Sequence, residues 1–377
     1  MRRHRDRIYI VLFLAICILP GAGMFFPAQE EVGANQVLAS KPQLIREEKW
    51  NPDFLKETDK YVSDHFAFRQ QFITMNDRLL AEVFHVSGND KVVVGKKGWL
   101  FFNETVKDFM NQPTMSQADC RKTAKTLALL QEHFLDQGSH FLFTIAPNKN
   151  SLYPQYMPGY LRPLRGENNR EMLEKEMASC GIHYADLYQM FIQEERVLYH
   201  RLDSHWNNEG AALACEFLLR RLETEPAEYV DSPTRPARNF SADLYEMLFP
   251  KGREKDWNVI YDYDFKYGYE GQVKDTEDIE IRTVCPGRTG SLAMYRDSFG
   301  NALLPFAAES FGKAYFSRQF PWDTQAVDEN PPDAVVIEIT ERNLDQIADT
   351  APVMEAPERQ MTGQKGKASF ADRKSVV

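Results

Sequence analysis

A chain of 377 residues that is 43% hydrophobic and 12% aromatic has enough apolar material for a large folded core, which excludes a globally disordered protein. Lysine and arginine together number 45 against 55 aspartates and glutamates, so the net charge is −10, and no basic cluster interrupts the body of the chain. Binding of a phosphate backbone needs a concentrated positive surface, so we expect no nucleic-acid partner.

The first predicted element is a membrane anchor. Residues 1–7 carry four arginines, and the 19 residues of Ile8–Phe26 carry no charge. Such a run crosses a bilayer core of roughly 30 Å at about 1.5 Å per residue. The arginines hold the leading end in the cytoplasm, so residues 1–26 predict a single-pass protein of the cell membrane whose bulk lies outside the cytoplasm. A cleaved signal peptide is the alternative.

The next segments lead into the main domain, which we expect over residues 52–350. Residues 27–51 are polar and contain two prolines, which predicts a tether. Residues 52–84 repeat apolar positions three and four apart, which predicts one or two amphipathic helices, and residues 90–102 predict a hairpin around a glycine pair. We therefore treat residues 52–115 as an N-terminal extension of helices and a hairpin.

Beyond Ser116, the expected N-cap of a helix that ends at Gly138, strand patterns alternate with helix patterns. Strands are predicted at 140–147, 182–187, 291–298, 313–320 and 334–341, and helices at 169–181, 207–223 and 301–312. This alternation predicts an α/β fold with a mostly parallel sheet covered on both faces. Residues 225–284 break the pattern and predict an insertion, and residues 351–377 predict a disordered tail.

Four cysteines follow the apolar N-terminal run: Cys120, Cys180, Cys215 and Cys285. They permit two disulfides in an exported protein, but reduced buried thiols fit the apolar helical stretches equally well, so both alternatives stay open. The chain contains no CxxC pair, P-loop, GxGxxG or HExxH motif. We therefore expect no cofactor and no metal.

The strongest chemical signal is an acid and an imidazole two residues apart, Asp203 and His205, before a predicted helix. Far along the chain, Ser298 follows a predicted strand and precedes another helix, with Gly300 easing the bend. Reactive residues of open α/β sheets lie at such strand ends, and amide groups at the helix start can stabilise an oxyanion. Because a serine hydroxyl needs a base, we predict His205 as that base and Asp203 as its orienting acid.

Each part of this site has a simpler explanation. The acid–imidazole pair is often structural, and a serine at a strand end is often a helix N-cap. His200, Asp203 and His205 also have a spacing that permits metal binding, but no fourth ligand is evident.

These motifs resemble the SGNH-hydrolase-like acetyltransferases of bacterial alginate O-acetylation and the bacterial group called DHHW proteins. The resemblance covers roughly residues 60–345. It rests on these segments of the chain: "SDHFAFRQQF", "VVVGKKGWLFF", "IAPNKNSLYPQYMP", "DSHWNNEGA", "RDSFG" and "PDAVVIEITERNL".

The resemblance implies a flavodoxin-like α/β/α domain with a triad of Ser298, His205 and Asp203, in which the Asp-x-His pair precedes the serine. It also implies transfer of acetyl groups to a polysaccharide outside the membrane, together with a membrane-bound O-acyltransferase partner. The chain departs from the pattern at Arg296, where a glycine is usual, and at Ser204.

The rest of the site is less clear from the sequence. Asn148 is a candidate oxyanion donor, Lys149 and Tyr153 are candidates to line the cleft, and Trp206 is expected to wall it, although structural roles are an alternative for the first three. An acetyltransferase is the leading expectation. An acetylesterase with the same triad and a non-catalytic polysaccharide-binding or assembly factor are the alternatives.

Overall fold

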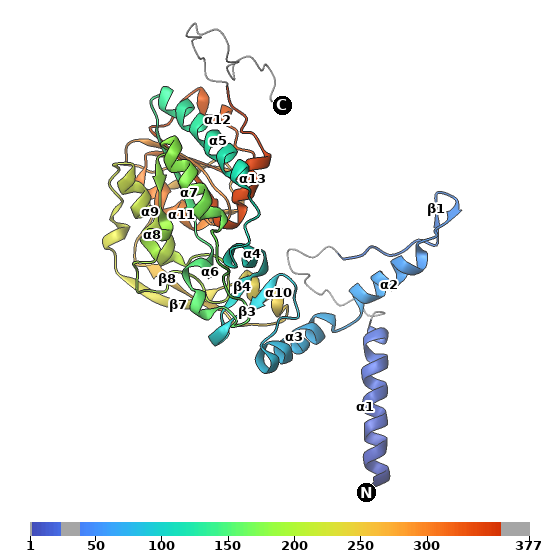
Figure 1. Ribbon diagram of the computed structural model, residues 1–377. Helices are drawn as coiled ribbons and strands as arrows, with labels where there is room; N and C mark the ends of the chain where they lie inside the picture. The colour runs from blue at the N-terminus through green and yellow to red at the C-terminus, as the bar shows by residue number, and fades with distance from the viewer. Residues whose placement is uncertain (1, 24–37, 356–377) are drawn as a thin grey trace. The chain divides into compact units, whose positions relative to one another are not determined.

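The computed structural model describes residues 2–23 and 38–355 (Figure 1). The end of the predicted anchor at residues 24–26, the predicted tether up to residue 37 and the predicted tail from residue 356 lie outside the described residues. The chain divides into two compact units. One is formed by residues 1–92 and 245–254, and the other by residues 93–244 and 255–377.

The first unit contains the N-terminal helices. α1 spans Arg2–Gly23, over most of the predicted anchor. Within residues 2–23 and 38–355, no helix combines the length and the apolar content that a membrane span requires. The elements that follow are β1 (Ile45–Arg46), β2 (Lys49–Trp50), α2 (Phe54–His65), α3 (Arg69–Leu79) and a π-helical turn over Leu80–Phe84. Residues 52–84 thus form two helices, separated by Phe68 in the left-handed conformation with a φ of 65°.

The second unit is built on a seven-stranded sheet with the order β6-β5-β13-β11-β12-β10-β9. Five strands are parallel: β5 (His140–Ala146), β6 (Tyr184–Ala185), β11 (Ser291–Tyr295), β12 (Lys313–Ser317) and β13 (Ala334–Thr340). β10 (Glu280–Val284) and β9 (Gly268–Glu270) add to the edge at β12 in antiparallel orientation. The predicted α/β fold with a mostly parallel sheet is confirmed.

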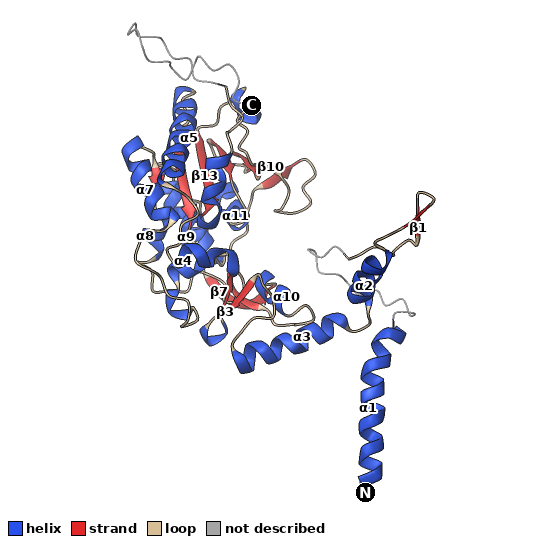
Figure 2. Ribbon diagram, turned by 45° about the vertical axis from the view of Figure 1, so that its right-hand side comes forward, coloured by secondary structure: helices blue, strands red, loops and turns tan. Residues whose placement is uncertain are grey.

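Helices cover both faces of this sheet (Figure 2). Alternate residues of β5 point to opposite faces. Phe141, Phe143 and Ile145 belong to one hydrophobic cluster, whereas Leu142 and Ala146 belong to another. The first cluster includes residues of α5 (Gln117–Asp136), α7 (Asn169–Cys180) and α13 (Leu344–Asp349), and the second includes residues of α8 (Leu187–Phe191), α9 (Asn208–Arg221) and α11 (Gly300–Ser310). The unit therefore has three layers.

The strand order differs from a flavodoxin-like sheet in one respect. In chain order the five parallel strands lie as 2-1-5-3-4, whereas a flavodoxin-like sheet has the order 2-1-3-4-5. If the count starts at β11 and runs through β12, β13, β5 and β6, the spatial order becomes 2-1-3-4-5. The sheet is thus flavodoxin-like with its chain order permuted. For this reason the loop after β6, which carries Asp203 and His205, precedes the serine in sequence.

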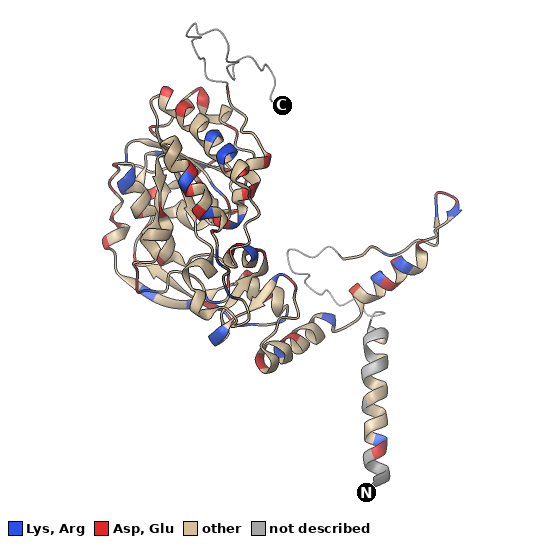
Figure 3. Ribbon diagram, viewed as in Figure 1, with Lys and Arg blue, Asp and Glu red and all other residues tan. Residues whose placement is uncertain are grey.

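Local signals explain why the helices begin where they do. Ser116 and Asp119 form a capping box at the start of α5, in which the Ser116 hydroxyl accepts from the Asp119 amide at 3.2 Å and the Asp119 carboxylate accepts from the Ser116 amide at 2.8 Å. The predicted N-cap is confirmed. Along α5 the basic residues Arg121, Lys122 and Lys125 precede the acidic Glu132 and Asp136, whereas α7 mixes the two signs (Figure 3).

The segment predicted as an insertion, residues 225–284, has two parts. β7 (Thr234–Phe240) and β8 (Asp256–Tyr261) pair as a separate two-stranded ribbon, with α10 (Asp243–Leu248) between them in sequence. β9 and β10 instead extend the main sheet. The predicted hairpin at residues 90–102 forms through β3 (Val92–Val94) and β4 (Leu100–Phe102). The remaining short helices are α4 (Val106–Phe109), α6 (Lys149–Leu152) and α12 (Gln325–Asp328).

The four cysteines that follow the N-terminal helix are free thiols. Cys120, Cys215 and Cys285 are buried, and Cys180 is exposed. Of the two alternatives, the structure has reduced thiols and no disulfide among these four.

Candidate active site

Ser298 lies in a sharp turn between β11 and α11, which we call the Ser298 turn (residues 296–300). The Asp297 carboxylate accepts from the amide of Phe299 at 2.9 Å and, through its other oxygen, from the amide of Thr340 at 2.8 Å and the side chain of Asn343 at 3.1 Å. A single anion thereby ties the turn to the end of β13 and to Asn343 just after it. Because the Phe299 amide is already bonded to Asp297, it is not a free donor for an oxyanion.

The departure at Arg296 has a structural consequence for Gly300. The Arg296 side chain is buried and donates to the carbonyl of Thr276 at 2.9 Å. A Cβ on Gly300 would lie 2.5 Å from the Arg296 Cβ, closer than nonbonded carbon atoms approach. Gly300 therefore makes room for the arginine side chain. The expected easing of the bend does not describe its role, since Gly300 has no left-handed φ.

The Asp-His loop (residues 200–205) brings the predicted base to the serine. His205 Nε2 lies 2.9 Å from Ser298 Oγ, and His205 Nδ1 lies 2.6 Å from Asp203 Oδ1. The same Asp203 oxygen accepts from the His205 backbone amide at 2.9 Å, which fixes the acid and the imidazole within one short loop. The three predicted residues are thus hydrogen-bonded in series, with Nδ1 placed to donate to Asp203 and Nε2 placed to accept from Ser298.

Asp203 remains an anion although it is buried. Its side chain is 1% exposed, and burial by itself would raise the pKa of its carboxyl. Hydrogen bonds and the charge of His205 outweigh that effect, together with a bond from the Asp243 amide to Asp203 Oδ2 at 2.6 Å, and the pKa of Asp203 lies well below its ordinary value. An anion beside Nδ1 stabilises a positive charge on the imidazole. The His205 side chain is 21% exposed and Ser298 is partly exposed, so the pair is not sealed from solvent.

Of three residues predicted to surround the cleft, Lys149 and Trp206 are buried and Tyr153 is partly buried, and each bonds the backbone of a neighbouring segment. Lys149 is 4% exposed and donates to backbone carbonyls of the Asp-His loop. The Tyr153 hydroxyl accepts from the Leu198 amide at 2.9 Å. Trp206 is 1% exposed and donates from Nε1 to the Phe299 carbonyl at 3.1 Å. For Lys149 and Tyr153 the structure fits the structural alternative, whereas Trp206, expected to wall the cleft, lies beneath it.

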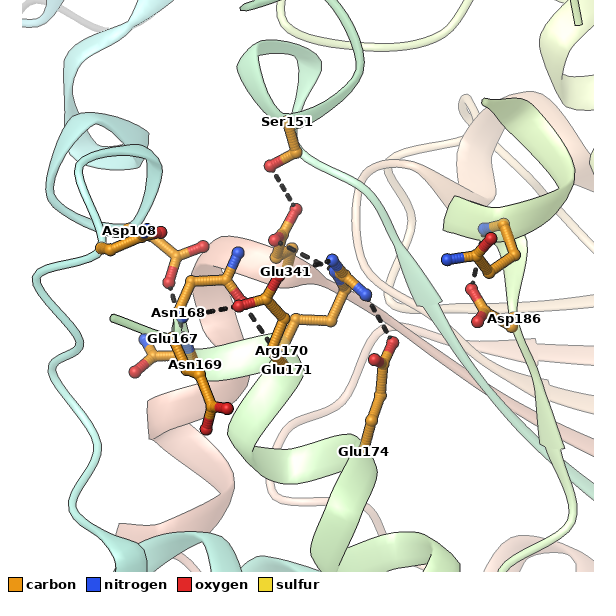
Figure 4. A network of polar contacts seen from close by, with 12 residues as sticks. Asp108, Ser151, Glu167, Asn168, Asn169, Arg170, Glu171, Glu174, Asp186 and Glu341 are labelled. Carbon is orange, nitrogen blue, oxygen red and sulfur yellow. Dashed lines mark hydrogen bonds and ion pairs between the residues drawn. The ribbon is translucent and has the colours of Figure 1, made fainter. Parts of the chain in front are cut away.

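The backbone of Asn148 bonds Glu341, a buried member of the polar network drawn in Figure 4. The Asn148 backbone amide donates to Glu341 Oε2 at 2.7 Å, and Ser151 donates to the same carboxylate at 2.9 Å. Arg170 lies 3.5 Å from the other oxygen of Glu341 and bonds Glu174 at 2.7 Å. Among the described residues, neither side-chain atom of Asn148 has a hydrogen-bond partner, although both are buried. The amide remains a candidate oxyanion donor.

Arg342 is a site residue that sequence reasoning missed. Its guanidinium lies 5.3 Å from the ring centre of Phe299, the residue after the serine, and 5.5 Å from that of Phe102. The Phe299 ring is in turn 4.7 Å from the His205 ring. In the sequence, Arg342 belongs to the segment "PDAVVIEITERNL", which we interpreted only as the last strand and its end. The signal that points to Arg342 is its place after β13, the strand next to β11.

The site also has a geometry that resembles part of a metal centre. Ligand atoms of Asp203, His205 and Asp243 lie within 4.8 Å of one another, whereas His200, which the sequence suggested as a ligand, places its ring against Phe240 at 3.7 Å. Both imidazole nitrogens of His205 already have partners within 3 Å. The donor set therefore fits a proton-relay site better than a tetrahedral metal site.

Comparison with known proteins supports the resemblance. Residues 92–253 match the family described as SGNH hydrolase-like domain, acetyltransferase AlgX. This stretch includes Asp203 and His205 and ends before Ser298. The chain is 24% identical over 259 residues to a protein of Pseudomonas syringae pv. tomato named probable alginate O-acetylase AlgJ, across 66% of this chain and 61% of that protein. The chain thus spans less than two thirds of this relative's length.

Two solved structures are also similar. Bacillus cereus PatB1 superposes with a TM-score of 0.52 at 17% identity, over 67% of this chain and 96% of that one. A DHHW family protein from Eubacterium siraeum gives a TM-score of 0.49 at 16% identity, over 62% of this chain and 90% of the other. The similarity to PatB1 concerns the fold alone. The resemblance to SGNH-hydrolase-like acetyltransferases is confirmed.

Proposed function

We propose that this protein is an O-acetyltransferase that carries the acetyl group on Ser298 and transfers it to a hydroxyl of a polysaccharide. The observation that carries this proposal is the hydrogen-bonded series from Ser298 through His205 to Asp203, with bonds of 2.9 and 2.6 Å. A serine activated in this way is a nucleophile suited to acyl transfer. The similarity of residues 92–253 to an acetyltransferase domain supports acetyl as the group.

The proposed reaction has two balanced halves. Ser298 Oγ attacks the donor's carbonyl carbon while its proton passes to His205 Nε2, and the leaving group departs with that proton. In the second half, His205 takes the proton of an acceptor hydroxyl, which attacks the acetyl-serine ester and releases Ser298 with its proton restored. Asp203 stabilises the imidazolium in both halves. Water in place of the sugar hydroxyl would make the same site an esterase.

The proposal is tested with the purified protein and a nitrophenyl acetate as donor. Wild-type protein should release nitrophenol and yield an acetylated peptide containing Ser298, and Ser298→Ala should abolish both signals. Addition of an acceptor polysaccharide should increase turnover and give acetylated sugar, whereas an esterase would give acetate alone. A Ser298→Ala protein that supports normal polysaccharide acetylation in cells would refute catalysis and indicate a binding or assembly factor.

We also propose that the enzyme works outside the cytoplasm and receives acetyl groups from a membrane-bound O-acyltransferase. The location is based on the four arginines followed by the uncharged run Ile8–Phe26, and the partner on the resemblance. Protease added to cells with a permeabilised outer envelope should digest the protein, and full-length protein that survives contradicts the location. Loss of the partner should leave the nitrophenyl acetate reaction intact and abolish acetylation in cells.

A further inference from the structure

We propose that Lys149 is a positioning residue whose buried ammonium group holds the Asp-His loop in its reactive shape. The catalytic consequence rests on the function proposed above, whereas the structural role does not. The ammonium donates to the backbone carbonyls of His200 and Arg201 at 3.0 Å each and of Asp203 at 2.5 Å. A lysine ammonium has three N–H donors, so all three are used on this loop.

The three carbonyls share this cation as a hydrogen-bond donor. Three carbonyl groups from four consecutive residues accept from this one ammonium group. Lys149 is 4% exposed, and the loop residues His200 and Asp203 are 2% and 1% exposed. Buried carbonyls without a donor are costly, and their parallel dipoles repel one another. The Arg201 carbonyl also accepts from the Leu100 amide at 3.0 Å, and the ammonium adds one shared donor group that ties all three carbonyls together.

The surroundings of Lys149 act on its charge in two opposite directions. The ammonium lies 5.3 Å from the ring centre of Trp99 and 5.0 Å from that of Phe101, close enough for cation–π attraction. Burial lowers the pKa of Lys149 to about 7, against the opposing effects of the carboxylates of Asp203 and Asp256. Trp99 and Phe101 belong to the "GWLFF" segment, so this segment supports the catalytic loop through Lys149.

The three hydrogen bonds from the Lys149 ammonium to the Asp-His loop form what we call the Lys149 clamp. The bond to Asp203 links this clamp to catalysis. Lys149 binds the backbone carbonyl of Asp203, and the carboxylate of the same residue binds His205 Nδ1. Movement of the backbone at residue 203 would therefore shift His205 Nε2 relative to Ser298 Oγ, now 2.9 Å apart. A displacement of about 1 Å can slow an enzyme roughly 100-fold without changing how the substrate binds.

The test compares Lys149→Met with Lys97→Met in the full-length protein. Lys97 is an exposed lysine that also lies over an aromatic ring, that of Tyr156 at 5.6 Å, but does not bond the loop, so it is a matched control. Lys149→Met should lower kcat for nitrophenyl acetate roughly 10- to 100-fold and leave KM within about twofold. Amide hydrogen exchange over residues 198–206 should become faster in Lys149→Met and stay unchanged in Lys97→Met.

Hydrogen exchange separates failure of this inference from failure of the proposed function. If Ser298→Ala shows that the serine is not catalytic, faster exchange of the loop in Lys149→Met still supports the clamp. Wild-type exchange and wild-type kcat in Lys149→Met would overturn it. If that variant does not fold, Lys149→Gln replaces it. If neither folds, the wild-type protein with ¹⁵N-labelled lysine must show an ammonium that exchanges slowly with water, and its absence overturns the clamp.

Discussion

The two segments that form the site are held in place by opposite charges. The Asp-His loop surrounds a buried cation, Lys149, which binds its carbonyls. The Ser298 turn is organised by an anion, Asp297, which accepts from the amide of Phe299 and the amide of Thr340. Each segment leaves regular secondary structure, and in each a buried or partly buried charged side chain pairs backbone groups of that segment. The reactive groups can thus stand on loops and still be fixed.

The largest expected effect comes from replacing Asp203, the acid of the Asp-His loop. Asp203→Asn replaces an acceptor with an amide, so His205 loses the anion that fixes its tautomer and stabilises its charge. We expect kcat to fall on the order of 10⁴-fold, as in other serine–histidine–acid sites, with little change in KM. The control is Asp256→Asn, which changes a buried carboxylate that accepts from Leu202 in the same loop but does not contact the imidazole. Equal losses in both variants would contradict a specific role for Asp203.

The corresponding change in the Ser298 turn is Asp297→Ala. It leaves the amides of Phe299 and Thr340 without an acceptor, so we expect a loss of roughly 2–4 kcal/mol in unfolding free energy and of most activity. The control is Asp333→Ala at the other end of β11, where the carboxylate accepts from the Ser291 amide at 2.7 Å. That variant should lose stability in urea unfolding but keep its kcat. Loss of activity in both variants would mean that Asp297 acts only through global stability.

The sequence predicted the chemistry of this site better than its supports. Asp203, His205 and Ser298 were predictable because strand ends in a parallel sheet converge at one edge, and motif resemblance supported the same three residues. The role of Lys149 in the Asp-His loop was not predictable. The three carbonyls that it binds converge because of how the backbone curves, and backbone curvature leaves no pattern of residue types in the sequence. The permuted strand order was also missed, because alternation of helices and strands specifies the sheet but not the positions of its strands.

Gly300→Ala tests how tightly the Ser298 turn packs against the Arg296 side chain. The added methyl group would meet the Arg296 side chain at 2.5 to 3.0 Å, so we expect a loss of about 1–3 kcal/mol in unfolding free energy. Arg296→Gly introduces the residue that the resemblance leads us to expect at this position. In a double-mutant cycle, the double variant should lose at least about 0.5 kcal/mol less unfolding free energy than the sum of the two single losses. Gly159→Ala, where nothing lies within 4 Å of the added group, should be neutral. Additive losses for positions 296 and 300 would contradict the steric explanation.

The smallest expected effect is a pH dependence at the network beside the loop. Burial, followed by the nearby Asp108 carboxylate, raises the pKa of Glu341 from 4.5 to about 7. A carboxyl with a raised pKa in the folded state binds more protons there than in the unfolded chain between these two values. Its contribution to stability is therefore fully present below pH 4.5 and is lost as the pH rises through about 7.

Glu341→Gln keeps an oxygen that can accept from the Asn148 amide and removes the titration. Wild-type protein should thus lose more unfolding free energy between pH 5 and pH 8 than Glu341→Gln does, as measured by urea unfolding at each pH. The control is Glu167, an exposed glutamate that is also drawn in Figure 4. Glu167→Gln should follow the wild-type pH profile. A Glu341→Gln profile that is parallel to the wild-type profile would mean that Glu341 is charged throughout this range. Arg170, 3.5 Å away, would then determine its charge state despite its burial.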